Sequence, residues 1–142
     1  MKDNGKIRLD SREGIAHIEI YQSGEIQLHD VVWIDQTLRW LNQQLTAGVE
    51  LPLFLPEEII IDGTGSYSLS ENAYLYLGEM MSDCKMVAFV IHSYPQEVIA
   101  DLFKSSYLLH LNVRSFDAVT EAVEWIQSVP GQQQSSPVGV LG

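Results

Sequence analysis

Cysteine is nearly absent from this sequence, which has only Cys84 among its 142 residues. A single thiol cannot form a disulfide within a monomer, so a disulfide-stapled scaffold is excluded and a reducing compartment is favoured. Long apolar runs are absent as well, because none approaches the roughly 18 residues that a membrane helix needs. The opening MKDNGKIRLD has no signal-peptide core. We therefore expect a cytoplasmic protein without membrane association.

Basic residues are scarce: 8 lysines and arginines stand against 19 aspartates and glutamates, giving a formal net charge of -11. Such a surface repels phosphate backbones, so nucleic acid is excluded as a partner. The imbalance is strongest between Arg39 and Lys85, where acids occur without a base: Glu50, Glu57, Glu58, Asp62, Glu71, Glu79 and Asp83. A solvated face is the simpler interpretation of this block, and a docking site for a basic partner is the alternative.

Motifs for metal, nucleotide or nucleophile chemistry are also missing. The histidines are scattered, without an HExxH pattern or a cysteine pair: His17, His29, His92 and His110. GTGSYS, residues 63–68, lacks the lysine of a P-loop and the third glycine of a dinucleotide fingerprint, so we interpret it as a turn in which glycine permits positive φ. No G-x-S-x-G pattern presents a serine. These patterns predict no cofactor, no metal and no enzymatic activity.

Apolar residues recur with the period of a strand or of a helix along most of the chain. Ala16, Ile18 and Ile20 alternate with polar residues after a turn at Gly14, which predicts an N-terminal hairpin. Further short apolar runs predict buried parallel strands: residues 56–62, 85–91 and 111–116. Helix start signals lie between the strands: Asp30 as an N-cap, Ser68 with Glu71 as a capping box, and Ser93 with Gln96 as another. The first helix should end near Gly48.

This order predicts one α/β domain over residues 1–129, with a mixed sheet of about five strands, an N-terminal hairpin and about four helices. Residues 130–142 are rich in Gly, Pro, Gln and Ser, which predicts a disordered tail. Ligands of such sheets usually sit beyond the carboxyl ends of the parallel strands. That edge carries Asp62, Gly63, Thr64, Gly65 and Ser66, then His92 and Ser93. A Ser/His/Asp trio can assemble there by folding alone, although turn and capping roles explain the hydroxyls more simply.

Several stretches together resemble the STAS-like (SpoIIAA-like) proteins, the fold of anti-sigma-factor antagonists, and particularly the bacterial STAS/SEC14-domain proteins. They are GIAHIEI, EIQLHDV, EEIIIDGTGSYSLSENA, KMVAFVIHSYPQEVIADLF and VRSFDAVTEAVEWI, within residues 6–127. The resemblance implies a non-enzymatic signalling module whose partner is a regulatory kinase or an anti-sigma factor. In the antagonists a D-S-x-G serine is phosphorylated, but this sequence has SLSENA, with Ser70 and Glu71 where that Asp and Ser would stand. The regulated serine is therefore missing.

We expect the protein partner to bind the acidic loop and the helix that follows it, with Leu75 and Leu77 as further apolar anchors. The predicted binding residues are Asp62, Gly63, Thr64, Gly65, Ser66, Ser68, Ser70, Glu71 and Tyr74. The alternative is a small apolar ligand or lipid of the SEC14-like type, because a helix rich in Tyr and Met is suited to cover a cavity. A hydrolase or transferase would need Asp62 and His92 to meet. Apolar helix faces also allow a homodimer.

Overall fold

The computed structural model describes residues 1–45, 55–108 and 111–128. The predicted helix end at Gly48, the acid Glu50, His110 and the predicted tail lie outside the described residues. The described helices are α1 (Leu28–Leu45), α2 (Glu71–Met81), α3 (Tyr94–Ser106) and α4 (Val119–Ser128). The described strands are β1 (Lys2–Asp3), β2 (Ile7–Arg12), β3 (Ile15–Ile20), β4 (Gly24–Ile26), β5 (Glu58–Asp62), β6 (Tyr67–Leu69), β7 (Met86–Val90) and β8 (Asn112–Phe116).

The main sheet is mixed, with the strand order β1-β2-β3-β5-β7-β8. The strands β1, β2 and β3 pair antiparallel, whereas β3, β5, β7 and β8 run parallel. The β2–β3 hairpin turns through Glu13 and Gly14, which have φ values of 55° and 81°, as the primed turns of tight hairpins require. The α/β class, the hairpin and the parallel strands were predicted. The sheet has six strands rather than five because the two-residue strand β1 extends it.

The strands β4 and β6 form a second, two-stranded parallel sheet that the sequence did not predict. Its register places Gly24 opposite Tyr67 and Ile26 opposite Leu69. Each strand has only three residues, too few for an alternating pattern to stand out. This small sheet ties the chain between β3 and α1 to the loop that follows β5.

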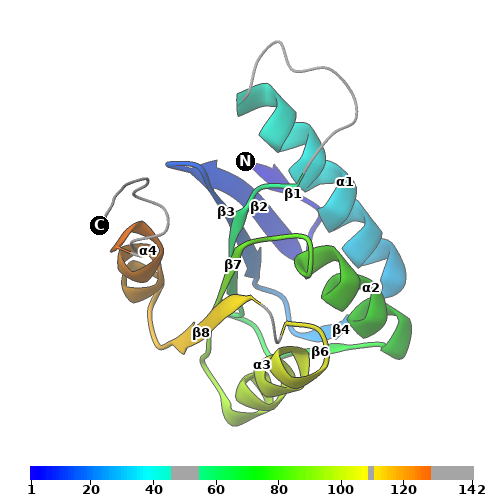
Figure 1. Ribbon diagram of the computed structural model, residues 1–142. Coiled ribbons are helices and arrows are strands. Elements are labelled where there is room, and N and C mark those ends of the chain that lie inside the picture. The colour runs from blue at the N-terminus through cyan, green and yellow to red at the C-terminus, as the bar shows by residue number, and fades with distance from the viewer. Residues whose placement is uncertain (46–54, 109–110, 129–142) are drawn as a thin grey trace.

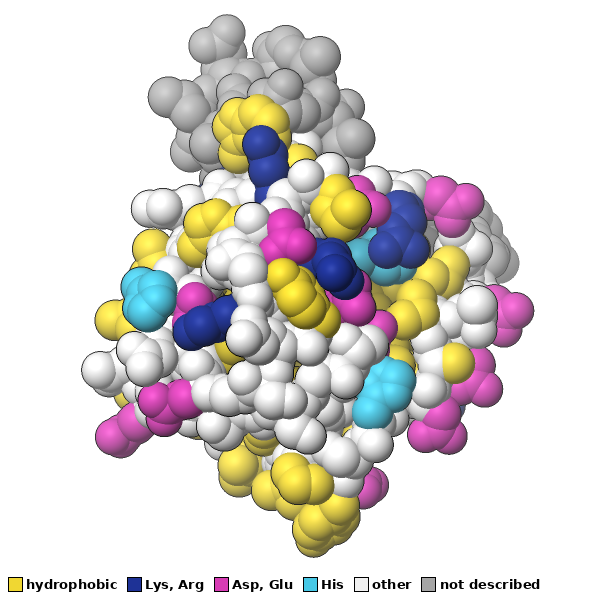
Figure 2. Space-filling model, turned by 180° about the vertical axis from the view of Figure 1, so that it is seen from behind, with side chains coloured by type: hydrophobic (Ala, Val, Ile, Leu, Met, Phe, Trp, Pro, Cys, Tyr) yellow, Lys and Arg dark blue, Asp and Glu magenta, His cyan; other side chains and the backbone are white. Residues whose placement is uncertain are grey.

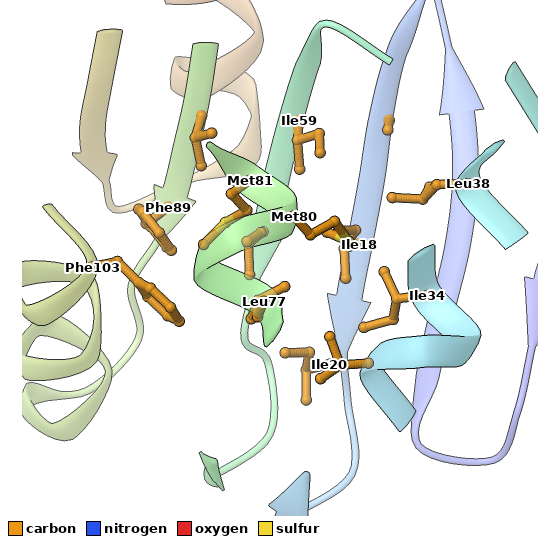
Figure 3. Packing of buried hydrophobic residues seen from close by; sticks show 14 of the residues in the cluster. Ile18, Ile20, Ile34, Leu38, Ile59, Leu77, Met80, Met81, Phe89 and Phe103 are labelled. Carbon is orange, nitrogen blue, oxygen red and sulfur yellow. The ribbon is translucent and has the colours of Figure 1, made fainter. Parts of the chain in front are cut away.

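Three helices cover one face of the main sheet and one covers the other (Figure 1). Ile59 and Ile61 face the layer of α1, α2 and α3, and Ile60 between them faces α4. Alternation along the strand explains this division, and burial on both faces explains why β5 reads as a continuous apolar run. Figure 3 shows Leu77, Met80 and Met81 of α2 pointing toward Ile18, Ile20 and Ile59 of the sheet, with Ile34 and Leu38 of α1, and Phe89 and Phe103, beside them.

The first helix begins before the predicted N-cap. It starts at Leu28, so Asp30 lies in its first turn. The carboxylate of Asp30 accepts the backbone N–H of Gln27 at 3.0 Å and the ammonium of Lys6 at 3.1 Å. Asp30 therefore stabilises the helix from within the first turn, where an acid also complements the helix dipole.

Both predicted capping boxes need correction. Ser68 lies in β6, and the N-cap of α2 is Ser70, whose hydroxyl accepts the N–H of Ala73 at 3.2 Å. Ser93 is the N-cap of α3, but its side chain makes no capping hydrogen bond. The side chain of Gln96 hydrogen-bonds instead to the backbone of His92, Gly63 and Gly65. Among the described residues, no helix is long and apolar enough to cross a membrane.

Candidate functional site

Asp62 and His92 meet at the carboxyl edge of the sheet. Asp62 ends β5 opposite Val90 of β7, and His92 follows two residues after that strand ends. The Nε2 of His92 lies 2.7 Å from the Oδ1 of Asp62. The Asp62 side chain is 17% exposed and the His92 side chain is 41% exposed. The contact that the enzymatic alternative requires is therefore present, and it occurs at the surface.

The side chain of Gln96 hydrogen-bonds to both loops at this edge, the one after β5 and the one after β7. Its side chain is buried at 4% exposure. Its Oε1 accepts the backbone N–H of His92 at 2.8 Å, and its Nε2 donates to the carbonyls of Gly63 and Gly65 at 2.7 and 2.9 Å. One amide group thus satisfies three backbone groups from two loops. Buried amides that are fully bonded hold a unique local structure.

Gly63 and Gly65 are required by close packing rather than by positive φ, which corrects the interpretation from sequence. Neither is among the glycines with positive φ in the described residues. A Cβ on Gly63 would lie 2.5 Å from the ring of Tyr67 and 2.9 Å from the Nε2 of Gln96, and a Cβ on Gly65 would lie 2.7 Å from the carbonyl oxygen of Tyr21. The loop is therefore packed tightly against β3 and α3.

The predicted hydroxyl and acidic residues are spread along this loop. Thr64 donates to the Oε2 of Glu19 at 3.2 Å, and the backbone N–H of Ser66 donates to the hydroxyl of Ser23 at 3.2 Å. Ser68 and Glu71 are exposed. Asp62 projects on the α4 side of the sheet, whereas Glu71 begins a helix on the opposite side. The acids of the predicted loop therefore do not form one charged surface.

The apolar anchors predicted on α2 are largely occupied by internal packing. The ring of Tyr74 stacks on Phe103 with a centroid distance of 4.7 Å, and its hydroxyl donates to the carbonyl of Leu102 at 3.2 Å. Leu77 is buried at 3% exposure, while Leu75 is 42% exposed. Tyr74 joins α2 to α3, and Leu77 belongs to the core.

An exposed apolar row on α3 was not predicted. Tyr94, Val98 and Leu102 are 75%, 38% and 50% exposed. They are spaced four residues apart, which places them along one side of a helix. Figure 2 shows hydrophobic side chains at the lower end of the molecule, where α3 lies in Figure 1. Two exposed acids, Glu97 and Asp101, belong to the same helix. These five residues are called the α3 face below.

A second unpredicted feature is a row of charged side chains on the sheet face that carries α4. Arg8 contacts the carboxylates of Asp3 and Glu19, each at 3.3 Å. Arg12 contacts Asp10 at 3.1 Å. The view from behind shows basic, acidic and histidine side chains next to one another (Figure 2). The sequence does contain a signal for this row, because charged residues alternate with the isoleucines and the leucine of β2 and β3.

The groups available for catalysis are limited. Within residues 1–45, 55–108 and 111–128, no serine, threonine or cysteine side chain hydrogen-bonds to His92, although a hydroxyl or thiol nucleophile needs such a base. Cys84 is buried and free, and burial raises the pKa of its thiol to about 12. The same residues contain no group of three or more His, Cys, Asp or Glu side chains that could hold a metal ion. The Asp62–His92 contact is the arrangement on which the enzymatic alternative depends.

No family model matches the sequence, and no curated protein matches it. Among solved structures, the chain is similar to an uncharacterised protein of the DUF3478 family, with a SpoIIAA-like fold, from Shewanella loihica PV-4. The two share 18% sequence identity with a TM-score of 0.50, and the match covers 88% of this chain and 98% of that one. The chain therefore has a SpoIIAA-like α/β fold, as the resemblance implied.

Proposed function

We propose that this chain is a non-enzymatic, STAS-like protein-docking module whose binding surface is the α3 face together with the carboxyl edge of the sheet. One observation carries the proposal: a row of exposed apolar side chains on α3 begins directly beside a loop that Gln96 holds in place. An apolar strip with a polar rim is the usual anatomy of a protein interface.

The apolar row supplies the contact area. Tyr94 is exposed over 75% of its surface, so little of its ring packs against the rest of the domain. Tyrosine is enriched among the residues that dominate binding energy, because its ring buries a large area with few rotatable bonds. Val98 and Leu102 extend the same side of α3 by two turns. An apolar row of two helical turns suits contact with a helix or loop of a partner protein better than contact with a small molecule.

The charges near this row indicate the chemistry of the partner. Glu97 and Asp101 are exposed, and Asp101 makes a long ion-pair contact of 3.8 Å to Lys104. With a net charge of -11, the chain as a whole attracts cationic surfaces. The proposed partner segment therefore presents apolar side chains flanked by lysine or arginine.

The rim favours docking because it is already ordered. Gln96 fixes Gly63 and Gly65, and the backbone N–H of Gly65 also donates to the carbonyl of Ile20 at 2.9 Å. A surface ordered before binding loses little conformational entropy when the partner arrives. We extend the predicted binding site from the loop to α3, because Tyr74 and Leu77 are engaged within the domain.

The resemblance to the STAS-like proteins supports a regulatory partner, such as a kinase or an anti-sigma factor, in bacterial signalling. Cys84, buried and free, is compatible with the cytoplasm. The apolar-ligand alternative receives less support, because Met80 and Met81 fill the space between α2 and the sheet. The enzymatic alternative rests on Asp62 and His92 alone.

Site-specific photo-crosslinking in cells of the source organism tests this proposal. A photoreactive phenylalanine replaces Val98 or Leu102, and the matched control replaces Glu124, an exposed residue of α4 on the other side of the sheet. We expect one protein to be cross-linked from both α3 positions and not from the control. Absence of any adduct from α3, or the same adduct from Glu124, would contradict the proposal.

A further inference from the structure

Within residues 1–45, 55–108 and 111–128, no helix covers one half of the sheet face that carries α4. The helix packs on Ile60 of β5, on β7 and, through Phe116, beside β8. The strands β2 and β3 lie beyond it, and their side chains on this face are mostly charged or polar. Between α4 and these strands lies a hollow of 220 Å³. Its walls include Arg12, His17, Glu19, Ile60, Asp62 and Val119.

His17 is the buried polar group of this hollow. It is only 7% exposed, and its imidazole has no hydrogen-bond partner within the described part of the chain. The great majority of buried polar side chains in proteins are bonded, because an unbonded one loses the hydrogen bonds it made to water. The imidazole lines the hollow, so a molecule occupying that space can supply the missing partner.

The protonation state of His17 determines what it can bond. Burial, with the nearby positive charge of Arg12, lowers the pKa of this imidazole from its usual value of 6.5. It is therefore neutral near pH 7, with one ring nitrogen as a donor and the other as an acceptor. A ligand that carries both donors and acceptors satisfies it best.

Charged side chains of both signs line the hollow, and some of them are already paired within the domain. Glu19 bonds to Arg8 through its Oε1 and to Thr64 through its Oε2, and the Oδ1 of Asp62 lies 2.7 Å from His92. Arg12 pairs with Ile15 at one end of β3, and Glu19 pairs with Asp62 at the other, with His17 midway. The Nε of Arg12 donates to Asp10 at 3.1 Å, while its terminal nitrogens make no hydrogen bond to the residues that the structure describes. Those nitrogens form the fork that recognises a carboxylate.

We infer that this hollow binds a small zwitterion of the amino-acid type, with its carboxylate at the terminal nitrogens of Arg12, its ammonium at Asp62, and its polar atoms bonded to His17. The volume of 220 Å³ lies below the range of about 300–1,000 Å³ that is typical of sites for drug-sized ligands. Simple anions fit poorly, because two carboxylates line the space. Ile60 and Val119 provide the apolar wall for an aliphatic side chain. This inference does not depend on the α3 face.

Histidine-selective NMR tests the inference with matched probes. The ring signals of ¹³C-labelled His17 are followed while L-alanine, L-serine or L-glutamine is added, to concentrations above about 1 mM, so that weak binding is also detected. Ethanolamine has the atoms of serine without the carboxylate, and 3-hydroxypropionate lacks the ammonium. The ring of His29, which is exposed on α1, serves as the internal control. We expect a saturable shift of His17 with at least one amino acid and a much weaker response to both half-molecules.

Variants then locate the carboxylate contact. Arg12→Gln should weaken amino-acid binding at least tenfold, whereas Arg114→Gln should leave it unchanged, because Arg114 lies over Phe116 and Trp125 on the far side of α4. Thermal melts of both variants confirm folding. The inference is overturned if none of the amino acids shifts the His17 signals. It is equally overturned if 3-hydroxypropionate binds as tightly as serine, or if Arg12→Gln binds like the wild type.

Discussion

Replacing Gln96 by methionine should destabilise the domain far more than the same change at the exposed Gln36. Methionine has nearly the length and shape of glutamine, but it lacks both the donor and the acceptor. The substitution leaves the N–H of His92 and the carbonyls of Gly63 and Gly65 without the bonds of 2.7 to 2.9 Å that Gln96 makes. Water cannot easily replace them, because Gln96 is only 4% exposed.

The size of the effect follows from these three bonds. A net contribution of about 1 kcal/mol for each gives a loss of about 3 kcal/mol in the free energy of unfolding. Native domains have a total of about 5–15 kcal/mol, so the loss is a large part of the stability. For a domain of this size it corresponds to a fall in Tm of about 10 °C.

Urea unfolding followed by circular dichroism measures this change, with Gln36→Met as the matched control. Gln36 lies on the exposed side of α1, so its substitution should change the free energy of unfolding by less than about 0.5 kcal/mol. Amide hydrogen exchange should also show faster exchange at His92 in the Gln96 variant than in the wild type. If Gln96→Met is as stable as Gln36→Met, then Gln96 does not hold this edge together.

Three further predictions concern buried groups. Folded His17 binds a proton less readily than unfolded His17, so the free energy of unfolding should fall as the pH is lowered below the usual pKa of 6.5. Urea titrations between about pH 7 and 5 measure how steeply this free energy depends on pH, and His17→Gln should make the dependence weaker. An unchanged pH dependence in His17→Gln would contradict this prediction. The Cys84 thiol, whose pKa burial raises to about 12, should react with Ellman's reagent only upon unfolding, and fast labelling of the native protein would show that the thiol is accessible. Gly78→Ala should cost about 1–3 kcal/mol, because its Cβ would lie 2.5 Å from the ring of Tyr107; a variant as stable as the exposed control Glu79→Ala would show that Tyr107 moves freely.

The main sheet could be predicted because its strands have clear apolar patterns. Alternation in β3 indicated a hairpin, and the continuous run of β5 indicated a strand buried on both faces. The small β4–β6 sheet could not be predicted, since three-residue strands such as GEI and YSL carry no period and depend on tertiary contacts. Ser70 rather than Ser68 is the N-cap of α2, because Ser68 is part of strand β6.

The position of Asp62 and His92 at one edge of the sheet was predictable, but the rest of the candidate site was not. Asp62 and His92 follow neighbouring parallel strands, so their meeting follows from topology. The role of Gln96 could not be predicted, because the sequence pattern also fits a local capping box and the choice depends on how two distant loops meet. The α3 row was present in the sequence as Tyr94, Val98 and Leu102. Its exposure became evident only when Ala100 and Phe103 were found to take the buried side of the helix.

The affinity of the cross-linked partner for α3 variants tests the docking proposal most directly. Calorimetry with the purified partner compares the wild type with the double variant Val98→Ser/Leu102→Ser, and with Leu28→Ser, which alters an exposed leucine of α1. Interface residues that dominate binding cost more than about 1 kcal/mol when truncated, so we expect the double variant to bind at least about tenfold more weakly, with Leu28→Ser unchanged. Equal affinity of the double variant and the wild type would contradict the proposal that α3 is the docking surface.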